Sequence, residues 1–338
     1  MRLHSVAAGL LAVAAAAPLL AQDQANSKPV RHGLSIGDYP NVTGLRINFR
    51  DRALGDVHGA NVTIWTPYDG DAGGTVRGLA LGLPMTAAGS IHGIATGLFG
   101  AGASKDLTGI GIAPVGLGAG GRLKGIAIGG VGVGGGGDLE GFAAGGIGAG
   151  LGGDAHGILM GGVGAGVGGN FHGAAIGGIG VGAGGNGRGL LVGGVGAGVG
   201  GSFQGIAISG IGTGAGGKFR GLAISGIGIG AGSSIDGVAI AGLGIGSPTI
   251  RKLAIAPFIG ANRMHGLMIA PVMARLEKGG SMRGVSVSTI NAMRGQQTGL
   301  TIGLVNYTRD LDGMQIGVIN IARNASVKFL PIVNYHRR

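Results

Sequence analysis

Residues 217–232 read Gly217-Lys218-Phe219-Arg220-Gly221-Leu222-Ala223-Ile224-Ser225-Gly226-Ile227-Gly228-Ile229-Gly230-Ala231-Gly232. Large apolar residues stand at 222 and 224, and again at 227 and 229, so each pair has the period of two that is typical of a β-strand. The odd step between the pairs requires a corner if both are to face inward, and the step from Phe219 to Leu222 indicates a second corner. An α-helix would need a period of 3.6 and few glycines. We therefore predict two short strands per unit, with both apolar pairs directed inward.

This unit is repeated along most of the chain. The glycine before each apolar triplet recurs every 16 residues, at Gly93, Gly109, Gly125, Gly141, Gly157, Gly173, Gly189, Gly205, Gly221 and Gly237. Uneven steps extend the series to Gly44, Gly59 and Gly78 on one side, and to Leu253 (in place of Gly), Gly266, Gly284, Gly299 and Gly313 on the other. A fixed short period predicts a repeat architecture.

Three all-β architectures fit short strands at this period. In a β-solenoid each coil of about 16 residues stacks on the next, which explains a single period directly. A β-meander would need two-residue turns, and Ala113-Pro114, Ala256-Pro257 and Ala270-Pro271 fit such turns poorly. An outer-membrane β-barrel would need strands of about 9–11 residues, roughly twice the length of these pieces. We therefore predict a β-solenoid, with the barrel and the meander as alternatives.

Glycine makes up 84 of the 338 residues, and its placement is ordered. Collagen is excluded because Gly does not fall at every third position, and disorder is disfavoured by 45% hydrophobic and only 12% charged residues. In residues 217–232, Gly228 and Gly230 alternate with the large side chains. We expect them to form a bare outer face that packs on a second face of the protein, another copy or the cell envelope.

The N-terminus has the features of an export signal. Residues 1–21 combine Arg2 and His4 with a short apolar run and Ala21 before a polar segment, which is typical of a cleaved signal peptide. The absence of Cys excludes a disulfide framework and a Cys-linked lipid anchor. We assign residues 1–21 to the signal peptide, 22–43 to an N-terminal cap, 44–248 to the regular repeat array, and 249–338 to degenerate, more polar repeats with a C-terminal cap.

The net charge is +11, and the basic residues are spread along the chain. Even spacing favours attraction to an anionic surface, such as lipid headgroups or polysaccharide. Nucleic-acid binding is disfavoured by an aromatic content of 4% and by the export signal. We predict self-association or an envelope surface as the partner, and no small-molecule substrate.

Two ladders of polar residues are predicted along one edge, where Gly-Gly-Asp and Gly-Gly-Asn sequences form turns. The first contains Asp106, Arg122, Asp138, Asp154, Asn170, Asn186, Ser202, Lys218 and Ser234. The second, two places further on, contains Lys124, Glu140, His156, His172, Arg188, Gln204, Arg220, Asp236 and Lys252.

These ladders do not predict a catalytic, cofactor-binding or metal-binding site. His156 and His172 are expected as coil neighbours, but two imidazoles without a third ligand make a weak metal site. Glu140 beside His156 has no nucleophile or oxyanion donor. We therefore predict that the protein is not an enzyme.

A further ladder of amides is expected near the C-terminus. Asn291, Asn306, Asn320 and Asn334 recur at one repeat position. We predict that they face outward and that their side chains hydrogen-bond to one another.

The last repeats resemble a known family. Gly299-Leu300-Thr301-Ile302-Gly303-Leu304-Val305-Asn306-Tyr307, then 313–320 and 330–335, look like a bacterial surface-repeat family of the spirochaete type, clearest over 250–338. The resemblance implies an exposed or envelope-associated protein without assigned catalytic residues. Together with the export signal, it favours a non-enzymatic cell-envelope or secreted structural or interaction protein. The alternatives are an integral outer-membrane β protein and an adhesin-like surface protein.

Overall fold

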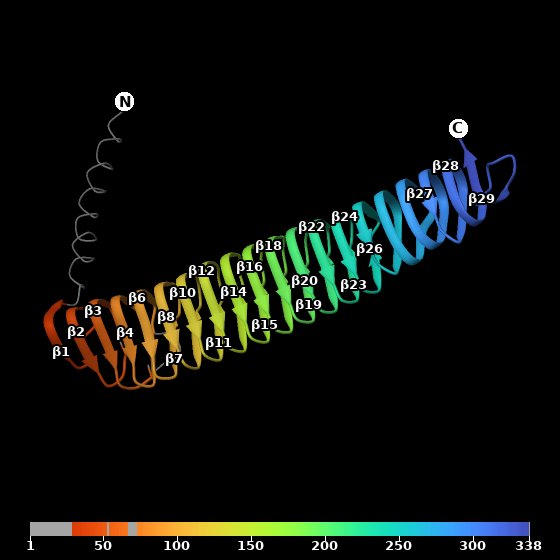
Figure 1. Cartoon of the computed structure of the whole chain (residues 1–338). Coiled ribbons are helices and arrows are strands. Elements are labelled where there is room, and N and C mark those ends of the chain that lie inside the picture. The colour runs from red at the N-terminus through yellow and green to blue at the C-terminus, as the bar shows by residue number, and fades with distance from the viewer. Residues whose placement is uncertain (1–28, 53, 67–72, 338) are drawn as a thin grey trace, which may run out of the picture.

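The computed structural model describes residues 29–52, 54–66 and 73–337, so the predicted signal peptide lies outside the described residues. These residues form a parallel β-solenoid of about 17 turns with about 16 residues per coil, which confirms the predicted fold class. The coils stack into an elongated rod in which β1 and β29 lie at opposite ends (Figure 1). The rod is therefore an open linear array, with each coil in contact with the coils before and after it.

Each regular coil contains one long and one short strand. The long strands are β4 (Thr75–Gly82), β6 (Ser90–Gly97), β8 (Leu107–Ala113), β10 (Leu123–Gly129), β12 (Leu139–Gly145), β14 (Ala155–Gly161), β16 (Phe171–Gly177), β18 (Gly187–Gly193), β20 (Phe203–Ser209), β22 (Lys218–Ser225) and β24 (Ser234–Ala241). The short strands are β5 (Met85–Ala88), β7 (Gly100–Ala103), β9 (Gly116–Ala119), β11 (Gly132–Gly135), β13 (Gly148–Leu151), β15 (Gly164–Val167), β17 (Gly180–Ala183), β19 (Gly196–Val199), β21 (Gly212–Ala215), β23 (Gly228–Ala231) and β25 (Gly244–Gly246).

Less regular coils flank this array. They contain β1 (Arg31–Ile36), β2 (Val42–Asn48) and β3 (Asp56–Thr63) before it, and β26 (Thr249–Ile255), β27 (Phe258–Ile302), β28 (Val305–Ala322) and β29 (Phe329–His336) after it.

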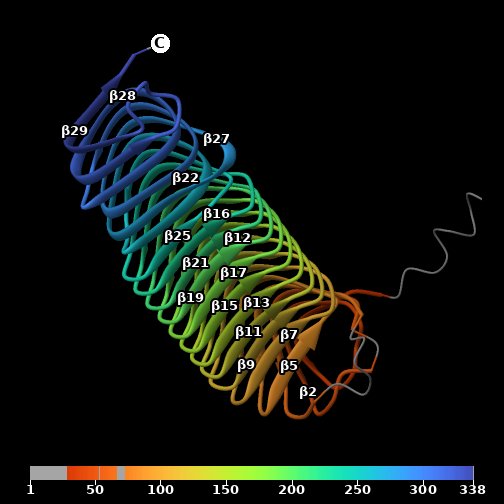
Figure 2. The same cartoon turned by 90° about the vertical axis from the view of Figure 1, so that its right-hand side faces the viewer.

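Long strands pair with long strands and short strands with short ones, in parallel and in register. Leu222, for example, pairs with Ile206 on one side and with Val238 on the other. The short strand β23 likewise pairs with β21 and β25. A hairpin meander would pair antiparallel, so like-on-like stacking accounts for the period of 16 in the sequence. Figure 2, which looks more nearly along the rod, shows the resulting stack of similar loops.

The prediction of which side chains face inward is largely wrong for the long strand. Phe219, Ala223 and Ser225 are buried, whereas Leu222 and Ile224 face outward. Strand β22 runs through residues 218–225, so the odd step between Phe219 and Leu222 places them on opposite faces of one strand.

The short strand fits the prediction better. Ile229 is buried and Gly228 and Gly230 face outward, as expected, whereas Ile227 lies exposed at the corner before them. The solenoid therefore has a bare glycine face on its short strands and an aliphatic face on its long strands.

The glycine that marks the repeat has a specific structural cause. At Gly157 φ is +136°, and a Cβ atom there would lie 1.9 Å from the carbonyl oxygen of Gly141 in the preceding coil. L-residues rarely adopt this φ, and no side-chain carbon fits at this distance from an oxygen. Every coil from Gly44 to Gly313 repeats this arrangement except one.

That exception corrects the sequence alignment. Lys252, with φ of 84°, pairs with Gly237 and with Gly266, so Lys252 rather than Leu253 replaces the glycine. Arg251 pairs with Asp236 and therefore continues the second polar ladder in place of Lys252.

The first and last strands of the rod pair with their neighbours in opposite directions. Strand β1 pairs parallel with β2, Gly33 opposite Gly44, so the coil register begins within residues 22–43. Strand β29 pairs antiparallel with β28 and closes the described part of the rod at the C-terminal end.

Candidate functional site

The outward-facing side chains of the long strands and the following corner form a continuous surface, which we call the aliphatic stripe. It consists of three ladders: Ile110, Ile126, Phe142, Ile158, Ala174, Leu190, Ile206, Leu222, Val238, Leu253 and Leu267; Ile112, Ile128, Ala144, Met160, Ile176, Val192, Ile208, Ile224, Ile240, Ile255 and Ile269; and Val115, Val131, Ile147, Val163, Ile179, Val195, Ile211, Ile227 and Leu243.

The stripe is long and well exposed. Ile110 is 40% and Ile147 57% exposed, although both are large aliphatic side chains. With about 4.8 Å between coils, the stripe extends over about 50 Å, and at a width of about 15 Å it covers roughly 700 Å². Soluble monomers rarely expose apolar patches beyond a few hundred Å² unless the patch is an interaction site.

A ladder of polar residues lies along one edge of the stripe, two residues before its first ladder, and we call it the polar rail. Its members are His32, Thr43, His58, Arg77, His92, Thr108, Lys124, Glu140, His156, His172, Arg188, Gln204, Arg220, Asp236, Arg251 and His265. Basic residues and histidines dominate this ladder, and its only acidic members are Glu140 and Asp236.

The expected neighbours within the rail are in contact. The rings of His156 and His172 stack in parallel with centroids 5.1 Å apart. Lys124 Nζ lies 2.7 Å from Glu140 Oε2, and this hydrogen bond and the charge of Lys124 lower the pKa of Glu140. In the described part of the chain, no three His, Cys, Asp or Glu residues are grouped so as to hold a metal ion.

The first predicted polar ladder acts as a turn brace between coils. At six positions a side-chain oxygen accepts a hydrogen bond from the backbone N–H of the equivalent residue one coil later, namely at Asp106, Asp138, Asp154, Asn170, Asn186 and Ser202. Asp154 Oδ1 accepts from Asn170 N at 2.6 Å, and Asn170 Oδ1 accepts from Asn186 N at 2.9 Å. The backbone N–H of Asn170, and next its side-chain amide, donate hydrogen bonds to Asp154 and thereby lower the pKa of Asp154.

A depression lies along the polar rail between Arg188 and Arg220, and we call it the basic notch. Gly187 occupies the inward ladder position that Phe171 and Phe203 fill in the neighbouring coils. The depression has a volume of about 340 Å³, and Arg188 and Arg220 are among its lining residues. The notch was not predicted, and Gly187 alone does not explain it, because Phe203 and Val199 fill the place that a Cβ of Gly187 would take.

An apolar groove continues the stripe at the C-terminal end. It has a volume of about 620 Å³, begins at Ile269 and includes Val287, Leu304 and Val318. Ile332 of the antiparallel strand β29 contributes to its lining. The stripe therefore ends in a concave apolar surface.

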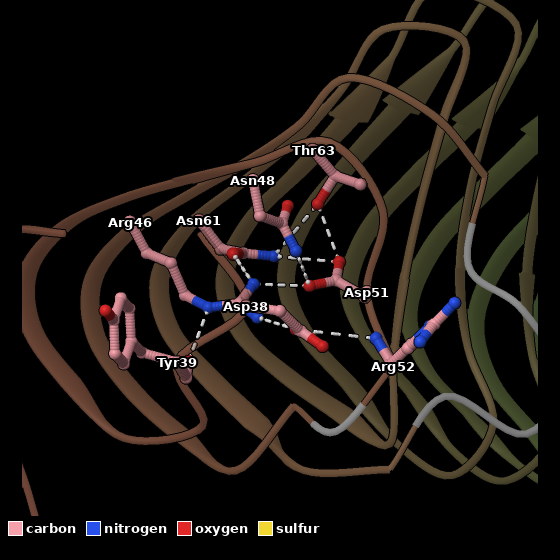
Figure 3. A network of polar contacts seen from close by, with 8 residues as sticks. All are labelled: Asp38, Tyr39, Arg46, Asn48, Asp51, Arg52, Asn61 and Thr63. Atoms are coloured by element: carbon pink, nitrogen blue, oxygen red, sulfur yellow. Dashed lines mark hydrogen bonds and ion pairs between the residues drawn. The ribbon is translucent and has the colours of Figure 1, made fainter. Parts of the chain in front are cut away.

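A buried polar network occupies the interior of the first coils (Figure 3). Arg46 is fully buried and its guanidinium donates hydrogen bonds to Asp51, to Asn61 Oδ1 at 2.7 Å and to Asp38 Oδ1 at 2.6 Å. Asp51 also accepts from Thr63 Oγ1 at 2.6 Å. Two carboxylates thus compensate one buried cation, which identifies the network as a structural brace of the N-terminal end.

The C-terminal amide ladder faces the interior, so the prediction of an outward ladder is wrong. Asn291, Asn306 and Asn320 are fully buried, and the Nδ2 atoms of the first two each donate to the next Oδ1 at 2.7 Å. The predicted amide stacking is therefore present. Asn334 is not part of it, because it lies on β29 opposite Gln315.

The comparisons with known proteins identify no relative. No protein-family model, no curated protein and no solved structure matches the chain. Among the described residues, no helix is long and apolar enough to span a membrane.

Proposed function

We propose that the chain is an exported, non-enzymatic interaction protein that attaches to the bacterial cell envelope through the aliphatic stripe. The observation that carries the proposal is the stripe itself, which keeps three apolar ladders in register on one exposed face. At about 25 cal/mol per Å², covering roughly 700 Å² of apolar surface gives at most about 17 kcal/mol, which offsets association costs of about 4–15 kcal/mol.

The proposal includes the statement that the protein has no enzymatic activity. It is supported by the placement of the predicted polar residues, which stand on an open edge with one residue of each ladder per coil. Glu140 is bonded to Lys124, and His156 stacks on His172, so these side chains are engaged with their rail neighbours.

Cell fractionation tests the proposal. The full chain is expressed in a bacterial host, and the envelope fraction is washed with alkaline carbonate. We expect the wild type in the envelope fraction and its release by carbonate. The triple variant Ile126→Thr, Ile147→Thr, Ile206→Thr keeps β-branched residues on the surface and should move to the soluble fraction.

The matched control places three hydroxyl groups on the bare glycine face. Gly150, Gly166 and Gly180 each have open space where a Cβ would lie, so their replacement by Ser should leave the distribution unchanged. Resistance of the wild type to carbonate would support an integral membrane protein instead. A wild type found wholly in the soluble fraction would contradict envelope attachment.

A further inference from the structure

The basic notch concentrates positive charge beside the aliphatic stripe. Arg188 and Arg220 belong to the rail two coils apart, which places their Cα atoms about 10 Å from each other. Lys218 and His172 also line the notch. The remaining polar lining includes the amide of Gln204, which lies on the coil between the two arginines. The notch therefore offers several hydrogen-bond donors around one small depression.

The cations of the notch have no salt-bridge partner in the part of the chain that the structure describes, although Asp236 stands beside Arg220 in the next coil. Among the described residues, Arg188, Lys218 and Arg220 take part in no ion pair. The carboxylates of the rail on either side are engaged elsewhere. Glu140 lies 2.7 Å from Lys124, and Asp236 Oδ2 lies 3.6 Å from Arg251. An anion of the size of a phosphate fits this charge and these donors.

The aliphatic stripe runs alongside the basic notch on the same strands. Leu190 follows Arg188 by two residues, and Leu222 follows Arg220 by two residues, and in both pairs the cation is exposed and its aliphatic neighbour is partly exposed on the outside of the coil. A ligand that occupies both surfaces must combine an anionic group with apolar chains.

We propose that the basic notch binds the phosphate-bearing headgroup of an anionic lipid, and that this face of the rod lies on an anionic membrane surface with the aliphatic stripe against the acyl region. This inference rests on the proposed function, because it names the partner of the stripe. It predicts peripheral binding parallel to the membrane, with the other cations of the rail adding long-range attraction.

A second copy of the chain is the competing occupant. The stripe is large enough for a dimer, since about 800 Å² per partner is a standard interface. The charge of the rail disfavours a second copy as the occupant. A second copy would bring an equally basic rail, whose two acidic residues are already engaged with Lys124 and Arg251. An anionic lipid surface complements the same charges.

Vesicle co-sedimentation tests the inference with the purified, signal-free chain. The probes are phosphatidylcholine vesicles with and without phosphatidylglycerol. We expect binding only to the phosphatidylglycerol-containing vesicles, weakened by added salt. A surface Lys or Arg contributes about fivefold to such binding, so Arg188→Gln with Arg220→Gln should weaken it about 25-fold. Lys105→Gln with Lys278→Gln removes the same charge several coils away and should weaken it far less.

A second set of variants separates the lipid from a free anion. Leu190→Thr, Ile206→Thr and Leu222→Thr retain the cations and should also reduce vesicle binding, and excess glycerol phosphate should compete only weakly. Complete competition by glycerol phosphate together with full binding by these stripe variants would identify a site for free phosphate and overturn the proposal. Equal binding to both vesicle types, or a dimer in size-exclusion chromatography that the stripe variants dissociate, would overturn it too. If the protein is found in the envelope fraction but binds no vesicles, the lipid proposal is refuted and the proposed function stands.

Discussion

Replacing Gly173 by Ala tests the contact that holds the coils together. Gly173 has φ of +141°, and a Cβ atom there would lie 1.8 Å from the carbonyl oxygen of Gly157. An L-residue in a left-handed conformation costs about 1–2 kcal/mol. Ordinary contact also requires the two coils to separate by more than 1 Å, which weakens at least two inter-coil hydrogen bonds at about 1 kcal/mol each. We therefore expect a local destabilisation of about 3–4 kcal/mol.

The assay must report local stability, because a repeat array need not unfold in one step. Hydrogen exchange followed by mass spectrometry should show faster exchange in β14, β16 and β18, with distant coils such as β4 unaffected. The matched control is Gly166→Ala, where nothing lies within 4 Å of the new Cβ. It should exchange like the wild type or more slowly, since Ala costs less entropy in a strand than Gly. Equal exchange in the two variants would refute the steric explanation of the glycine ladder.

Three further predictions concern other ladders. Lys252→Gly should raise stability by about 0.5–1 kcal/mol in thermal unfolding, because Gly relieves the positive φ of 84° and loses part of that gain to chain entropy. Asn306→Ala should lower it by about 2–4 kcal/mol in urea unfolding, because the amides above and below are left buried without partners, whereas the exposed Asn186→Ala should cost under about 1 kcal/mol. The pKa of Asp154 is lowered from 3.8 by the N–H of Asn170, so its stabilisation is present above pH 3.8 and is lost as pH falls through the lower native pKa. Asp154→Asn keeps an acceptor and should remove this part of the acid sensitivity in a pH titration of unfolding.

The repeat was predictable from sequence because its cause is local and identical in every coil. A glycine forced by backbone contact recurs at 16 residues, and that single period favours stacked coils, whereas the hairpin alternative is excluded only by the parallel pairing of the strands. Which side chains face inward was less predictable. Burial of large aliphatic residues is the ordinary expectation, and it fails at Leu222 and Ile224 because the small side chains of Ala223 and Ser225 occupy the interior.

The site followed from sequence only in part. The polar ladders were visible because their residues recur, although the irregular step near Lys252 shifted the last member by one place. The basic notch joins residues of three successive coils that lie far apart in the sequence, and only the stacked register shows that Arg188, Gln204 and Arg220 line one depression.

The parallel register also makes the rod extensible. Because each coil contacts only its neighbours and repeats the same contacts, an in-frame duplication of one 16-residue unit adds a coil without altering the others. Each such event lengthens the rod, the stripe and the rail together by about 4.8 Å. The gene can therefore change the length of the exposed apolar surface in fixed increments while the fold of each coil stays the same.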